Sequence, residues 1–205
     1  MSTPSMKTTG LTPRNLTADV HGRRAPLLDD SVCGMLIFVA TEVMFFTALI
    51  SAFVIIKAGV EPWSPPVGVR LPVVATAANT VLLCLSGVFL HQAGRRFAAE
   101  GPTPRVGTLL GGAALLGACF VLFQGFEWVR LVAYGMTMTS GIFGACFFLL
   151  IGTHGLHAAA AATAMAHLYT RLLRHELRLD HLRAMQVLWY FVVGIWPVLY
   201  GLVYF

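Results

Sequence analysis

Only a few of the acids and histidines, which can bind protons or metals, lie within the long apolar runs of this sequence. Glu42 lies about 11 residues into the first run, roughly 16 Å from its start if the run is helical. His154 and His157 are three residues apart in a later run, so they share one helical face. Glu127 lies near the end of another run, three residues before Arg130. If these runs cross a bilayer, each charged group inside costs from about a few to more than ten kcal/mol and needs a partner or a function.

Glu42 has both structural and functional interpretations. Its predicted depth is near the middle of the bilayer, where no run supplies a Lys or Arg, so we expect the carboxyl to be mostly protonated at neutral pH. Three roles stay open: a neutral carboxyl hydrogen-bonded within the bundle, a proton relay, and a group regulated by lipid. The estimated depth of His154 allows a contact with Glu42, and the two groups would then titrate as a coupled unit.

The acid at the end of the third run has a simpler interpretation. Glu127 is expected to pair locally with Arg130 or to contact lipid headgroups. Its neighbours Gln124 and Trp128 are likewise expected to be interfacial or lipid-contacting, because aromatic and polar side chains gather where a span leaves the hydrocarbon.

The histidines and cysteines do not indicate a metal site. His154 and His157 on one helix cannot bind opposite sides of a haem iron, and no third ligand for copper or zinc is visible beside them. His91 and His167 both lie near span ends and could in principle form a two-helix haem pair, but nothing else marks a haem pocket. Four cysteines lie singly in different runs, without a CxxC pair, so neither zinc nor a disulfide framework is predicted. These are Cys33, Cys84, Cys119 and Cys146.

The composition explains why these groups are expected inside a membrane. Of the 205 residues, 57% are hydrophobic and 11% charged, and the mean hydropathy is +0.76, far from the composition of a soluble domain. Five apolar runs are long enough to cross about 30 Å of hydrocarbon as helices. The predicted fold is therefore an all-α integral membrane bundle of five transmembrane helices, at residues 31–57, 71–93, 106–130, 139–166 and 184–205. Residues 1–30 form a polar tail, and the fourth helix is expected to continue past its span.

The basic residues lie beside the apolar runs rather than in one groove-binding patch, so nucleic acid is not an expected partner. Eleven of the 14 Lys and Arg residues fall in the tail and in the second and fourth connections. Because cytoplasmic segments carry this excess, the N-terminus is predicted in the cytoplasm and the C-terminus outside.

Small residues at four-residue spacing in the third and fourth runs allow close helix packing and leave room for a cleft. Gly107 and Gly111 show this spacing, as do Gly155 and Ala159. Phospholipid is an expected ligand, with phosphate partners at the cytoplasmic mouth. The candidate partners are Arg95, Arg96 and Arg174.

Several stretches resemble subunit III of haem-copper terminal oxidases, in the short five-helix form. Residues 34–46 are similar to the family's first shared helix, residues 71–86 to its LP and NT-x-LL-x-x-S pattern, residues 124–128 to its Q-x-x-E-aromatic element, and residues 153–158 to its HGLH stretch. The residues on these motifs are Glu42, Asn79, Thr80, Gln124, Glu127, Trp128, His154, Gly155 and His157. The last helix departs from the pattern W-H-F-V-D, since Tyr190 replaces the His and Val193 the Asp.

The resemblance implies a subunit without redox centres in a prokaryotic inner membrane. It implies that haem and copper belong to the catalytic subunit I beside it, and that other oxidase subunits, phospholipid and a larger respiratory supercomplex are its partners. Its implied role is to stabilise the catalytic subunit, bind lipid and support proton uptake during oxygen reduction. Two alternatives stay open: a nitric-oxide-reductase accessory protein of the same family, and an independent proton-coupled transporter. The electron donor, cytochrome c or quinol, is not readable.

Overall fold

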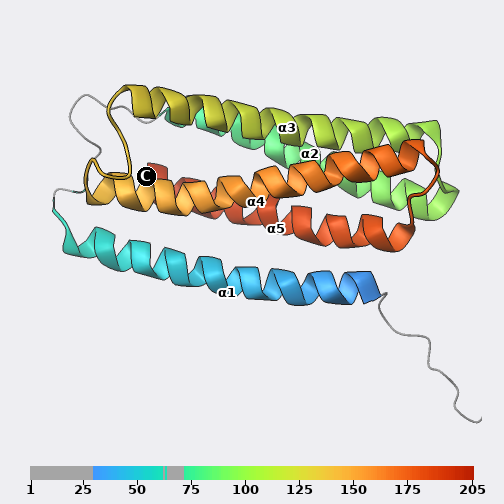
Figure 1. Cartoon of the computed structure of the whole chain (residues 1–205), viewed down its shortest axis with the longest axis horizontal. Coiled ribbons are helices and arrows are strands. Elements are labelled where there is room, and N and C mark those ends of the chain that lie inside the picture. Colours follow the sequence, from blue (N-terminus) through green and yellow to red (C-terminus); the bar gives the residue numbers. More distant parts are fainter. Residues whose placement is uncertain (1–29, 62, 64–71) are drawn as a thin grey trace, which may run out of the picture.

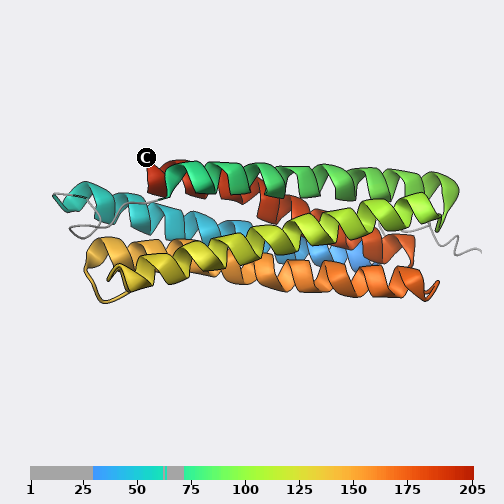
Figure 2. The ribbon, with the colours of Figure 1, turned by 90° about the horizontal axis from the view of Figure 1, so that it is seen from above.

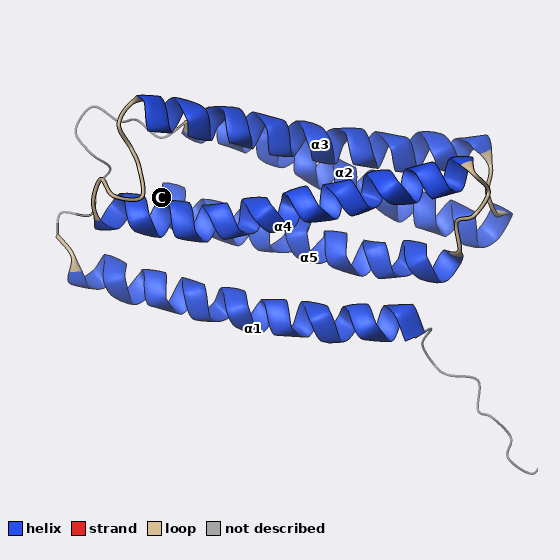
Figure 3. Ribbon diagram, viewed as in Figure 1, coloured by secondary structure: helices blue, strands red, loops and turns tan. Residues whose placement is uncertain are grey.

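Five long helices account for nearly all of the residues that the structure describes (Figures 1 and 3). The computed structural model describes residues 30–61, 63 and 72–205. The helices are α1 (Asp30–Gly59), α2 (Val73–Glu100), α3 (Pro104–Ala133), α4 (Ile142–Leu173) and α5 (Leu179–Tyr204). No strand occurs in those residues, so the all-α prediction is confirmed. The predicted tail lies outside the described residues, apart from Asp30.

Each helix is long enough to cross a membrane. The shortest, α5, has 26 residues and the longest, α4, has 32, or roughly 39 and 48 Å at 1.5 Å per residue. All five contain an apolar stretch suited to a bilayer. The fourth helix does continue past its predicted span, to Leu173, and α5 begins at Leu179 rather than at residue 184. Helices that are consecutive in sequence run antiparallel (Figure 2).

Helices α2–α5 form a bundle whose core is held by hydrogen bonds from two buried tryptophans of α5. Trp189 Nε1 donates to Ser86 Oγ at 2.9 Å, and Trp196 Nε1 donates to Thr80 Oγ1 at 2.8 Å. A Cβ at Gly117 of α3 would lie 2.7 Å from the Trp189 ring, so only glycine leaves room for this indole. Trp189 of α5 thus contacts α2 through its hydrogen bond to Ser86 and α3 through its packing on Gly117.

Helix α1 lies beside this bundle rather than within it (Figure 1). Its buried side chains are Val32, Phe46 and Phe53, while Met44 and Ile55 on its other face are more than 70% exposed. An apolar face of this kind is stable only against lipid or another membrane protein.

The two ends of the molecule differ in charge. The N-terminus of α1, the α2–α3 turn and the α4–α5 turn lie together (Figure 1); we call this the basic end. Of the nine described Lys and Arg residues, Lys57 and Arg130 lie at the opposite end with the C-terminus. The other seven are Arg95, Arg96, Arg105, Arg171, Arg174, Arg178 and Arg183.

Candidate functional site

The acid predicted near the membrane midplane meets a histidine from another helix. Glu42 lies about 18 Å along α1, and His157 about 22 Å along α4. Glu42 Oε2 lies 2.9 Å from His157 Nε2, with the two side chains 15% and 21% exposed. Glu42 Oε2 has no hydrogen-bond partner in the described part of the chain, so this contact is a close ion-pair distance rather than an aligned hydrogen bond. The histidine is therefore the group that must compensate the buried carboxyl oxygen.

The other ring nitrogen of His157 fixes what this contact can be. His157 Nδ1 lies 2.8 Å from the carbonyl oxygen of Thr153, one turn earlier in α4. A carbonyl only accepts, so Nδ1 must carry a hydrogen. Two arrangements are then possible. Either Nε2 carries no hydrogen and faces a protonated Glu42, or Nε2 carries a hydrogen and faces an ionised Glu42. In both cases one proton lies between the two side chains, and the pair is neutral overall.

Aromatic rings surround this proton-binding pair. Phe46 is fully buried, and its ring centroid lies 5.4 Å from that of His157 in an edge-on arrangement. Phe45, 44% exposed, lies 6.5 Å from the same imidazole on the outer side. A low-polarity lining disfavours a separated charge on either partner.

His154 lies in the bundle core and not against Glu42. Its ring stacks on Trp196 with centroids 4.9 Å apart, the edge of Phe120 lies against it, and 1% of its surface is exposed. Neither of its nitrogens has a hydrogen-bond partner among the described residues. Burying an unpaired charge is costly, so His154 is a neutral packing residue here. The contact considered between Glu42 and His154 is replaced by one to His157, because equal depth does not decide which helix face meets α1.

The motif residues Asn79 and Thr80 hold helices together. Asn79 Nδ2 donates to the carbonyl oxygen of Phe120 at 3.1 Å, joining α2 to α3. Thr80 accepts from Trp196 and donates to the carbonyl oxygen of Thr76 at 2.8 Å. Interhelical hydrogen bonds of this kind replace the missing hydrophobic driving force between helices in a bilayer.

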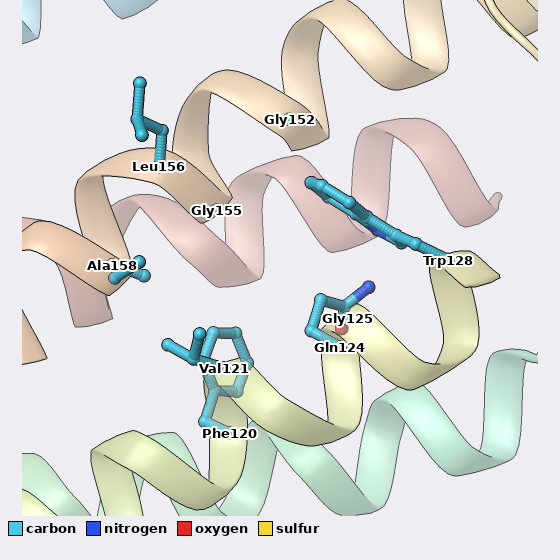
Figure 4. A pocket seen from close by; sticks show the side chains of 10 residues that line it. Phe120, Val121, Gln124, Gly125, Trp128, Gly152, Gly155, Leu156 and Ala158 are labelled. Carbon is cyan, nitrogen blue, oxygen red and sulfur yellow. The ribbon is translucent and has the colours of Figure 1, made fainter.

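Gln124 and Trp128 line a cavity of about 360 Å³ between α3 and α4 (Figure 4). Gly152 and Gly155 form its α4 wall, and a Cβ at Gly155 would lie 2.9 Å from the Trp128 ring. Gln124 is 4% exposed, and its amide has no hydrogen-bond partner in the described ranges. The absence of a side chain at Gly155 therefore makes room for the Trp128 ring.

The predicted polar residues at the ends also have defined surroundings. Glu127 Oε1 accepts from Arg130 Nη1 at 3.2 Å, which is the local ion pair expected from the sequence. Arg96 lies 3.6 Å from Glu100 and, with Arg95, lines a hollow on the surface of α2. Arg174 caps α4 at the same end of the molecule but does not line that hollow.

The described residues contain no group of three or more His, Cys, Asp or Glu side chains that could hold a metal ion. Both nitrogens of His157 are engaged, His154 is stacked among aromatic rings, and His91 Nδ1 lies 2.9 Å from the Tyr190 hydroxyl. These histidines do not offer two nitrogens to a common point, so they do not fit an axially ligated haem.

The sequence did not single out the Thr153 carbonyl, Phe46 or the Tyr190 hydroxyl as parts of a site. Spacing could have suggested Thr153, since it precedes His157 by one turn. Contacts between distant helices, such as Phe46 with His157, carry no comparable signal in one sequence.

Known proteins resemble this chain along most of its length. The model of a family described as "Cytochrome c oxidase subunit III" matches residues 15–205. A "Cytochrome c oxidase subunit 3" of Loxodonta africana is 31% identical over 194 residues, covering 90% of this chain and 73% of the relative. A "Probable cytochrome c oxidase subunit 3" of Mycobacterium leprae (strain TN) is 29% identical over 206 residues, covering 97% and 98%. A protein named "Cytochrome c oxidase subunit 3" from Corynebacterium diphtheriae is 30% identical over 176 residues, covering 84% and 86%.

Proposed function

Because the chain belongs to the cytochrome c oxidase subunit III family, we propose that it is the non-redox subunit that supports proton uptake by the catalytic subunit of an aerobic haem–copper oxidase. In this role it also stabilises that subunit and binds phospholipid. The haem and copper belong to the neighbouring catalytic subunit, in keeping with the histidine geometry of this chain. The complex resides in a prokaryotic inner membrane.

The contact between Glu42 and His157 is the observation that carries the proton part of this proposal. A carboxyl and an imidazole 2.9 Å apart near mid-depth hold one proton between them. The two side chains are partly exposed, and their contact joins α1, which lies beside the bundle, to α4. A pair at the margin is able to exchange its proton with a neighbouring subunit, whereas a pair in the core is not.

The surrounding residues define what the pair does. Thr153 holds the imidazole in one orientation through Nδ1, so Nε2 stays directed at α1. Phe46 excludes water from the bundle side. The pair therefore stores a proton beside the catalytic subunit and regulates its delivery, while the chemistry of oxygen reduction takes place in the other subunit.

Glu42→Gln in the intact oxidase complex tests the proposal. Glutamine keeps the shape of the neutral acid and can donate to His157 Nε2, but it cannot release a proton. We expect an assembled complex with near-normal initial turnover, together with an altered pH dependence of oxygen consumption or faster loss of activity during turnover. Glu127→Gln is the matched control, because this acid already pairs with Arg130 at the membrane edge.

The outcomes separate the candidate roles. Complete loss of activity in an assembled Glu42→Gln complex would make Glu42 an obligatory step in a proton path rather than a regulator. A variant that matches the wild type in turnover, pH profile and lifetime would leave Glu42 with structural hydrogen bonding only. An infrared carbonyl band of a protonated carboxyl, lost in Glu42→Gln, identifies which partner holds the shared proton.

The proposed orientation places the basic end in the cytoplasm, because Lys and Arg accumulate on that side of membrane proteins. A reporter that is active only outside the cytoplasm should be active when fused after Phe205. Activity of a cytoplasm-specific reporter at the same position would reverse the orientation and, with it, the side from which protons are taken up.

A further inference from the structure

A second polar cluster lies on the surface between α2 and α5, away from Glu42. His91 Nδ1 is 2.9 Å from the Tyr190 hydroxyl, and Gln186 Nε2 is 3.2 Å from the same hydroxyl. Gln186 Nε2 also lies 3.2 Å from the carbonyl oxygen of Leu90. Tyr190 is 40% exposed, and His91 is also exposed. The cluster therefore faces whatever surrounds the bundle.

The direction of these hydrogen bonds follows from their acceptors. The Leu90 carbonyl only accepts, which orients the Gln186 amide with its nitrogen toward both oxygens. Its two hydrogens then serve Leu90 and Tyr190. The tyrosine hydrogen is left to donate to His91 Nδ1, which makes His91 a neutral imidazole with its hydrogen on Nε2. In this arrangement the amide hydrogens of Gln186 and the hydroxyl hydrogen of Tyr190 all have acceptors. The N–H at His91 Nε2 is the donor that is left, and it points outward.

The backbone of α2 is shaped to allow this cluster. A Cβ placed on Gly94 would collide with the amide of Gln186, so a larger residue there would push Gln186 away from Leu90. Tyr190 occupies the position at which the resemblance to the subunit III family gives a histidine. The cluster is therefore a feature of this chain's own sequence.

An apolar groove of about 440 Å³ begins at His91 and follows α2 and α5 toward the middle of the membrane. Its lining residues are Cys84, Gly87, Val88, His91, Tyr190, Val193 and Gly194. Gly194 is exposed, and a Cβ there would meet nothing within 4 Å. The groove is thus open to the side at Gly194.

A cation lies on the other side of His91. Arg95 is one turn nearer the basic end, on the same face of α2 as His91, and is exposed. Arg96 already pairs with Glu100, whereas no ion pair within the described residues involves Arg95. Along α2, the positive charge of Arg95 is therefore followed by the N–H donor of His91, about 6 Å further along the helix axis. The apolar groove begins at His91.

We propose that this surface binds an anionic phospholipid from the leaflet at the basic end. The phosphate lies at Arg95, an ester carbonyl accepts from His91 Nε2, and one acyl chain occupies the groove beside Gly194. An outward N–H in hydrocarbon is costly without an acceptor, and a lipid ester supplies one at the correct depth. The inference rests on the lipid-binding part of the proposed function and gives that part a site and a headgroup charge. It does not depend on Glu42.

The test uses the full chain in nanodiscs of phosphatidylcholine with a minority of phosphatidylglycerol, followed by detergent extraction and mass spectrometry of the retained lipid. We expect about fivefold enrichment of phosphatidylglycerol, the effect of one arginine near an anionic surface. Arg95→Gln and Gly194→Leu should each bring the retained ratio to that of the bulk. The matched controls are Arg105→Gln, an exposed arginine at the same end, and Gly201→Leu, an exposed glycine of the same helix. Both controls should retain the enrichment.

Equal retention of the two lipids by the wild type would overturn the assignment of an anionic headgroup. Enrichment that survives Gly194→Leu would overturn the acyl groove, and enrichment abolished by added inorganic phosphate would reduce the site to an anion site. If no lipid is retained and Gly194→Leu releases the chain from the oxidase complex, the groove belongs to a protein contact. The pH profile of the Glu42→Gln complex is a separate readout, so failure of one proposal is distinguishable from failure of the other.

Discussion

Helix α1 and the bundle α2–α5 have similar compositions but are held in different ways. Within the most apolar 18 residues of each helix, 11% are buried in α1 and 39% in α4. The bundle is joined through its core by Trp189, Trp196 and Asn79, each donating to a neighbouring helix. Apolar composition alone therefore does not determine which helices form the stable core; buried hydrogen bonds and small residues do.

Three polar contacts, spread along its length, join α1 to the bundle. Ser31 Oγ lies 3.5 Å from Asp180 at the basic end, and Lys57 Nζ donates to the carbonyl oxygen of Leu202 at 3.2 Å at the opposite end. Glu42 and His157 lie between them. The contact between Glu42 and His157 is thus part of the attachment of α1 to the bundle.

The largest expected effect is in the bundle core, with Trp189→Ala. The fully buried indole fills the space left by Gly117 and donates to Ser86. Its removal leaves a large cavity and loses the hydrogen bond to the Ser86 hydroxyl, which still donates to the Leu83 carbonyl oxygen. The expected cost is about 3–5 kcal/mol in the free energy of unfolding. The measurement is the thermal unfolding midpoint in detergent. Met44→Ala on the exposed face of α1 is the control and should shift stability by less than about 0.5 kcal/mol; equal losses in the two variants would contradict the division into core and attached helix.

Phe46→Ala should weaken the attachment of α1 without unfolding the bundle. Phe46 is fully buried against His157 and Phe191, so the loss is about 3 kcal/mol and is confined to α1. Hydrogen–deuterium exchange by mass spectrometry should accelerate in α1 peptides and stay unchanged in those of α3. Phe45→Ala, which removes a half-exposed ring from the adjacent position, is the control. Acceleration of similar size in α3 would mean that α1 and the bundle unfold together.

The smallest effect is expected for Lys57→Met, which keeps the length of the side chain but removes its charge. The substitution loses the hydrogen bond to Leu202 and the position of the ammonium group 5.9 Å from the centre of the Phe53 ring. These contacts together are worth about 0.5–1 kcal/mol. Faster exchange should be limited to the last turn of α1. Ser51→Ala removes only a bond to its own helix and should be neutral; a loss from Lys57→Met larger than that from Phe46→Ala would reverse the ranking.

The number, type and approximate bounds of the helices followed from the sequence because apolar runs of this length have one stable form in a bilayer. The predicted span 184–205 begins five residues after the start of α5. Leu179 and Leu182 lie among charged residues, so the average hydropathy of that stretch is too low to indicate a span. The structure shows that Leu182 is buried. A prediction based on average hydropathy therefore misses the amphipathic ends of membrane helices.

The partner of Glu42 could not be chosen from the sequence. Depth along a helix is set by residue number, and it suggested His154 as the possible partner, whereas the structure places His157 against Glu42. Which histidine reaches α1 depends on the rotation of α4 about its own axis, and that is set by the packing of His154 on Trp196 and Phe120. Likewise, the three arginines proposed for lipid were correctly assigned to one end of the molecule by charge, but the surface on which each lies depends on helix packing.

The close approach of Gly155 to the Trp128 ring limits the substitutions that can accumulate at these two positions during evolution. With 2.9 Å between the ring and the position of a Cβ, alanine at residue 155 requires a smaller side chain at residue 128. A smaller side chain at residue 128 alone would enlarge the cavity between α3 and α4. Neither change is neutral by itself, so lineages that depart from this pair must pass through a less stable intermediate or alter both residues together. The two positions, 27 residues apart in the chain, are expected to evolve as one.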